Sequence, residues 1–126
     1  MGAPDAAIQR AERALGVAFP EDYRSFLSDP GSVARHFLPA GDFLTLCPVG
    51  DLLGLNDAAG PAGRLPGAVV IGGDGCRELL VYDFRQQPPP LLLIDSATAA
   101  WSEGLRQAAT LTEFLTHFPE HGWRWQ

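Results

Sequence analysis

Acidic side chains in the middle of the chain are the residues whose types and spacing could do chemistry. Residues 42–95 contain seven Asp and Glu against three Arg, a net charge of −4 out of the −6 of the whole chain. If this stretch folds as a β-hairpin followed by a returning strand, Asp74, Glu78 and Asp95 meet at one end of the sheet. Asp83 then caps the other end.

Gathered carboxylates of this kind have two interpretations. The first interpretation is a binding surface for a basic partner, because like charges at a sheet edge lower stability unless a cation offsets their repulsion. Its residues would be Asp74, Glu78 and Asp95, with Asp83 as a weaker contributor. The second is a solvated edge that discourages pairing between strands of different molecules. A magnesium or calcium site is not favoured, because the loop signature of such sites is missing.

The other candidate groups do not favour catalysis, a cofactor or a metal. Gly72–Gly75 lacks the Gly-Lys-Ser/Thr ending of a phosphate-binding loop, and we interpret it as a hairpin turn that needs positive φ. His117 and His121 have the spacing of a zinc pair, but Pro119 is expected to break the helix that would align them. The sequence shows no Ser-His-Asp or Cys-His signature. We therefore predict no catalytic residue, no cofactor and no metal.

Composition predicts one acidic domain over residues 1–126. Hydrophobic residues make up 46% and charged residues 19% of the chain, which is typical of a protein that buries a core. All nine basic residues are Arg, against fifteen Asp and Glu, so direct binding to nucleic acid or to an anionic membrane is not expected. Cys47 and Cys76 are expected to be reduced and mostly buried. Without a signal-peptide pattern or an apolar run near the ~20 residues of a membrane helix, we expect a cytoplasmic protein.

Apolar spacing and turn residues predict the elements that must position the carboxylates. Thr110 and Glu113 have the spacing of a capping box, and Pro119 is expected to end the helix that follows. The predicted helices cover 5–16, 20–27 and 110–118. A short helix is also possible at 49–55, before a surface loop at 57–67. The predicted strands are 43–47, the two strands of the hairpin 68–83, and 91–94. The sequence does not decide whether residues 32–42 form a strand, a helical turn or a loop. Residues 97–107 could form a helix or a strand, and a strand is favoured. This order predicts an α+β fold, a central and mainly antiparallel sheet flanked by N-terminal and C-terminal helices.

The C-terminal sequence GWRWQ is predicted to be packed. Two indoles left in water are costly, so Trp123 and Trp125 are expected to lie on the sheet or the last helix, or to contact a second copy. The alternative is a disordered end, which is common for the last residues of a domain.

Three segments together resemble the SUKH superfamily, the Knr-like and Syd-like proteins found widely as bacterial immunity proteins. They are ALGVAFPEDYRSFL (14–27), VVIGGDGCRELLVYD (69–83) and LTEFLTHF (111–118), and with the helix before the first of them the resemblance covers residues 8–118. The chain departs from the family pattern after the second helix, where Ser28-Asp29-Pro30-Gly31 replaces the usual Asn-Gly turn. The resemblance implies an α+β fold without catalysis. It also implies binding to a cognate toxin, often a nuclease or nucleic-acid deaminase, although other members are regulators or scaffolds.

The sequence-based hypothesis is therefore a non-catalytic immunity protein, a monomer or weak homodimer, that neutralises a basic toxin domain through Asp74, Glu78, Asp83 and Asp95. Its negative charge fits such a partner, because a protein that grips nucleic acid must itself be positive. The alternative is a regulatory or scaffold module that binds another protein. A hydrolase with dispersed catalytic residues ranks last.

Overall fold

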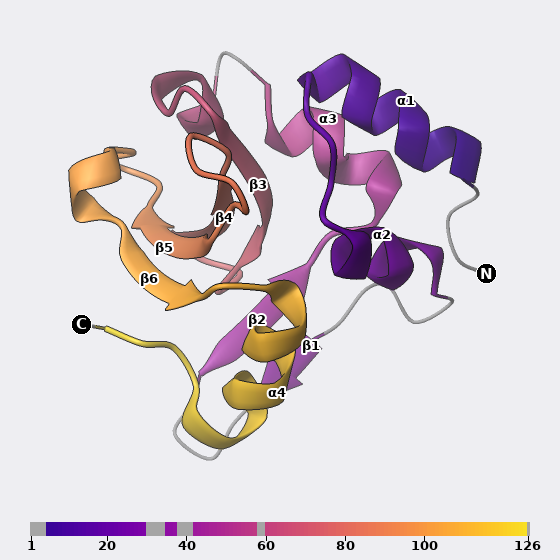
Figure 1. Cartoon of the computed structure of the whole chain (residues 1–126). Coiled ribbons are helices and arrows are strands. Elements are labelled where there is room, and N and C mark those ends of the chain that lie inside the picture. Colours follow the sequence, from indigo (N-terminus) through magenta and orange to yellow (C-terminus); the bar gives the residue numbers. More distant parts are fainter. Residues whose placement is uncertain (1–4, 30–34, 38–41, 58–59, 126) are drawn as a thin grey trace.

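Six strands form one antiparallel sheet in which the spatial order of the strands follows their order in the chain. The computed structural model describes residues 5–29, 35–37, 42–57 and 60–125 (Figure 1). The strands are β1 (Arg35–Phe37), β2 (Phe43–Leu46), β3 (Ala68–Gly73), β4 (Glu78–Asp83), β5 (Leu91–Asp95) and β6 (Leu105–Ala108). The helices are α1 (Asp5–Leu15), α2 (Glu21–Ser28), α3 (Leu52–Leu55) and α4 (Leu111–His121), with 3-10 turns at Val49–Asp51, Pro61–Arg64 and Trp101–Glu103. The predicted α+β fold is confirmed.

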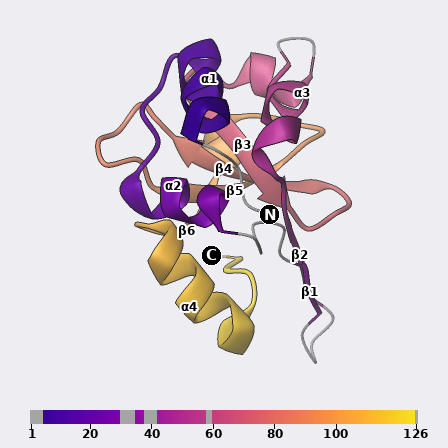
Figure 2. The ribbon, with the colours of Figure 1, turned by 90° about the vertical axis from the view of Figure 1, so that its right-hand side faces the viewer.

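The sheet is covered on both faces, which explains its long apolar runs. Successive side chains of a strand point to opposite faces, so Leu80 and Tyr82 of β4 join the main core whereas Val81 joins a second, smaller cluster. Helices α1, α2 and α4 lie one after another along the side of the main core (Figures 1 and 2). The second cluster is closed by Leu65 and Ala99 from loops on the other face.

The predicted start of α4 is confirmed, but its predicted end is wrong. The backbone N–H of Glu113 donates to Oγ1 of Thr110 at 3.1 Å, as a helix cap requires. The helix then continues through Pro119 to His121. A proline removes one backbone hydrogen bond, and in the last turn this loss is small beside the burial of Phe118. The backbone bond from Gly122 to Phe118, at 2.8 Å, closes the helix after the proline.

The C-terminal segment is packed through one of its two tryptophans. Trp123 is 5% exposed and its indole N–H donates to the carbonyl of Phe43 at 3.1 Å. The side-chain amide of Gln107 exchanges two hydrogen bonds with the backbone of Arg124, which ties the segment to β6. Trp125 is 53% exposed, so it does not pack on the sheet or the last helix, and a contact with a second copy stays a prediction.

Two further expectations are corrected in detail. The favoured strand in 97–107 holds for its end only, because a 3-10 turn at Trp101–Glu103 precedes β6. Cys47 is buried as expected, but Cys76 is exposed because it lies in the turn between β3 and β4.

Most of the undecided stretch 32–42 lies outside the described residues, and β1 is the strand found within it. Within the described ranges, no helix is long and apolar enough to cross a membrane.

Candidate functional site

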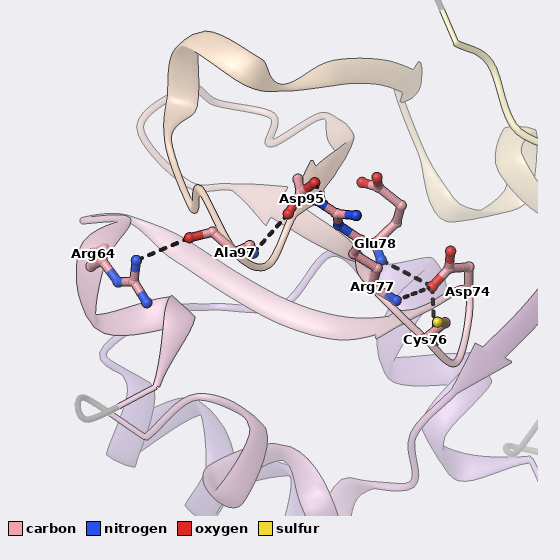
Figure 3. Close-up of polar contacts among 7 residues, drawn as sticks. All are labelled: Arg64, Asp74, Cys76, Arg77, Glu78, Asp95 and Ala97. Atoms are coloured by element: carbon pink, nitrogen blue, oxygen red, sulfur yellow. Dashed lines mark hydrogen bonds and ion pairs between the residues drawn. The ribbon is translucent and has the colours of Figure 1, made fainter.

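Three of the four predicted acidic residues lie together at one end of the sheet. Glu78 opens β4 and pairs in register with Asp95 at the end of β5. Asp74 begins the turn before β4, and its backbone N–H donates to the carbonyl of Glu78 at 3.1 Å. Figure 3 shows the three carboxylates around Arg77, which comes from the same turn. We call Asp74, Glu78 and Asp95 the acidic end.

Asp74 shapes the turn as well as adding charge. Its Oδ1 accepts the backbone N–H groups of Cys76, Arg77 and Glu78, each at 2.9 Å (Figure 3). An aspartate that accepts from the residues after it is the usual device for closing a tight turn. A substitution that keeps the acceptor oxygen, such as Asp74→Asn, therefore removes the charge with less damage than lysine would cause.

Asp95 is held as an anion by local donors. Its Oδ1 accepts the backbone N–H of Ala97 at 2.7 Å, and its Oδ2 accepts Nε of Arg77 at 3.0 Å. The hydrogen bond from Ala97, the nearby charge of Arg77 and further donors hold the pKa of Asp95 below its ordinary value, against a smaller effect of burial. Arg77 is largely exposed, so this ion pair adds little to stability.

Glu78 is the acid whose charge the fold disfavours. Partial burial raises the pKa of its carboxyl above the ordinary value, and the charges of Asp95 and Asp74 raise it further, while Arg77 acts in the opposite sense. Among the described residues, no hydrogen bond or ion pair to this carboxylate is found. The acidic end thus contains a carboxylate that an external cation would stabilise.

We expect Glu78→Gln to raise the free energy of unfolding at about pH 7 and to leave it unchanged at about pH 3. Because the pKa of Glu78 is raised by folding, the folded state holds this proton more strongly. The stability from this group is therefore present below the unfolded pKa and is lost as pH rises through the folded pKa. Glutamine stays neutral, so the free energy of unfolding of the variant should rise relative to that of the wild type as pH increases from the unfolded pKa through the folded pKa. Urea unfolding at several pH values measures the difference, and a variant less stable at neutral pH would contradict it.

Asp83 lies at the opposite end of β4, as predicted, but its side chain is fully buried. It accepts Nε and Nη2 of Arg85 at 2.9 and 3.1 Å, and the side chain of Gln86 at 3.1 Å. Burial acts to raise the pKa of Asp83, but the hydrogen bonds from Arg85 and Gln86 together hold it below its ordinary value. Arg85 is thereby fixed over the Trp101 ring, 3.9 Å from its centroid. Asp83 is satisfied inside the protein, and the candidate surface does not include it.

A groove beside the acidic end was not predicted from the sequence. It has a volume of about 560 Å³ and lies between α3 and the β3–β4 hairpin. Both cysteines line it, and burial together with the charge of Asp51 raises the pKa of the Cys47 thiol to about 12, so this thiol stays protonated. The sequence signal was the run of glycines at 72, 73 and 75, which we interpreted as turn chemistry alone.

The argument from Pro119 against a histidine metal pair is corrected, because α4 continues past the proline. The rings of His117 and His121 stack with their centroids 4.6 Å apart. Burial lowers the pKa of His117, and the charges of Arg124 and His121 lower it further. No third ligand completes a metal site here, since the described part of the chain contains no group of three His, Cys, Asp or Glu residues able to hold a metal.

Comparison with known families finds one match. The sequence fits the model of the SMI1 / KNR4 family (SUKH-1) over residues 2–117. A search of curated proteins finds no match.

Proposed function

The chain belongs to the SMI1 / KNR4 family (SUKH-1), and from this premise we propose that it is an immunity protein that neutralises a basic toxin domain by binding it. The family includes immunity-type and cell-wall-related proteins that are generally not catalytic. The toxins that best fit this surface are nucleases and nucleic-acid deaminases, because a domain that grips nucleic acid presents a positive groove. The proposed binding surface is the acidic end.

The environment of Glu78 is the observation that carries this proposal. Its carboxylate lies beside two others, and its pKa is raised by burial and by their charges. A Lys or Arg from a partner would relieve this repulsion, whereas the isolated protein gains nothing from it. Carboxylates placed in a nucleic-acid groove would also occupy the positions of phosphates. Binding there would block access of the substrate to the toxin.

The test begins with the toxin gene expected beside the gene for this chain. Glu78→Lys combined with Asp74→Asn changes the charge of the acidic end by three units and keeps the turn acceptor. Close charge pairs contribute roughly 1.5 to 7 kcal/mol of coupling, so affinity for the purified toxin should fall at least about tenfold. Cells that express the toxin should lose protection. Calorimetry and a survival assay measure the two effects.

A matched control changes the charge equally at other places. Glu21→Gln with Glu120→Lys also adds three units, at exposed positions on α2 and α4. This variant should bind and protect like the wild type. Equal protection by both variants would show that the acidic end is only a solvated edge. Absence of any neighbouring toxin that binds would favour a regulatory or scaffold role.

A further inference from the structure

The groove beside the acidic end has a floor without side chains. Gly72 and Gly73 of β3 and Gly75 of the turn contribute to its lining. At Gly72 and Gly73 the neighbouring strands approach so closely that a Cβ would lie 2.1 Å from the carbonyl oxygens of Thr45 and Glu78. Glycine is therefore required at both positions, and the hairpin leaves a hollow in the surface.

The lining of the groove combines apolar and acidic residues. Leu55 of α3 and Leu79 of β4 line it, and Leu55 is 39% exposed. Leu53, in the same short helix, is 51% exposed. Asp51 and Glu78 are the two acidic residues among those that line it. Glu78 also belongs to the acidic end, so the groove and the charged surface are continuous.

We propose that this groove receives an apolar side chain of the partner, flanked in the partner by Lys or Arg. The apolar side chain would pack against Leu55 and Leu79, and the flanking cations would pair with Asp51 and Glu78. Charge complementarity selects this occupant, because an acidic or neutral apolar segment would leave Glu78 beside its like charges. The inference rests on the proposed function and deepens it: it names the segment by which a basic toxin would be anchored. Desolvated apolar anchors surrounded by polar contacts are the usual source of binding energy in protein interfaces.

Gly54 allows the groove to be filled without damage to the fold. It lines the groove, and a Cβ built on it meets no atom within 4 Å. Gly54→Trp should therefore occupy the groove from α3, while Leu53→Trp, at an exposed position of α3 outside the groove lining, provides the matched control. Circular dichroism and thermal unfolding should be close to wild type for both variants.

The binding probe is a synthetic peptide, GKRFLRKG, compared with GKRSSRKG, which has the same charge without the apolar pair. In nuclear magnetic resonance titrations, the first peptide should shift the amide signals of Gly54, Leu55 and Gly73, and bind about tenfold more tightly than the second. Gly54→Trp should reduce this affinity about tenfold, and Leu53→Trp should not. Equal binding of both peptides, shifts confined to other surfaces, or unchanged binding by Gly54→Trp would overturn the proposal.

Protection against the toxin separates failure of this inference from failure of the proposed function. If Gly54→Trp protects cells fully while the Glu78→Lys and Asp74→Asn variant does not, the toxin is bound by charge and the groove proposal is wrong. If no toxin is bound but GKRFLRKG occupies the groove, the toxin proposal fails and the groove serves another basic protein. Loss of protection by both variants supports both proposals.

Discussion

Replacing Gly73 by alanine is expected to cost about 3 kcal/mol or more of the free energy of unfolding, a large share of the stability of a small domain. The new Cβ would lie 2.1 Å from the carbonyl oxygen of Glu78 and 3.2 Å from the Cα of Leu79. These are backbone atoms of the paired strand, so the clash is relieved only if β3 and β4 separate. That separation would break hydrogen bonds between the two strands and disturb the acidic end.

Gly54→Ala is the control for the loss of a glycine as such. A Cβ at Gly54 meets nothing within 4 Å, and alanine favours helix over glycine by up to about 1 kcal/mol. We expect this variant to be as stable as the wild type or slightly more stable. Urea unfolding followed by circular dichroism measures both variants. Similar midpoints for Gly73→Ala and Gly54→Ala would be incompatible with the close approach of β3 and β4.

Trp123→Ala is expected to lower the free energy of unfolding by about 3 to 5 kcal/mol, the usual cost of truncating a buried aromatic residue. The indole is 5% exposed and packs edge-on against Phe118, with ring centroids 4.9 Å apart. The Phe114 ring lies 5.6 Å away, and the indole N–H donates to the carbonyl of Phe43. The residue therefore joins α4 to β2, and its loss would leave a cavity and remove the hydrogen bond to the Phe43 carbonyl.

Trp125→Ala provides a control two residues away. Trp125 is 53% exposed, so its truncation should change the free energy of unfolding by no more than about 0.5 kcal/mol. Thermal and urea unfolding of the two variants, with size-exclusion chromatography, measure the contrast. A Trp123→Ala protein as stable as the Trp125→Ala protein would mean that the C-terminal segment does not hold α4 to the sheet.

The sequence predicted the features that depend on neighbouring residues. The capping spacing of Thr110 and Glu113 located the start of α4, because that interaction spans three residues. The hairpin and the strand after it are joined by short connections, so their register follows from the turn. For this reason the sequence alone was enough to bring Glu78 and Asp95 to the same end of the sheet, and the structure pairs them in register.

Only the tertiary structure decided what lies against each element from elsewhere in the chain. Asp83 was predicted as a surface acid, but packing around the end of β4 buries its side chain fully, and Arg85 and Gln86 from the next turn donate to it there. Pro119 was expected to end α4, yet the helix continues to His121, with Phe118 buried just before the proline. The glycines of β3 satisfied a turn pattern in the sequence, whereas two of them are required because neighbouring backbones approach them closely. The groove forms because these glycines carry no side chain and because α3 lies beside them. Packing of this kind, between segments distant in the chain, leaves no periodic signal in a single sequence.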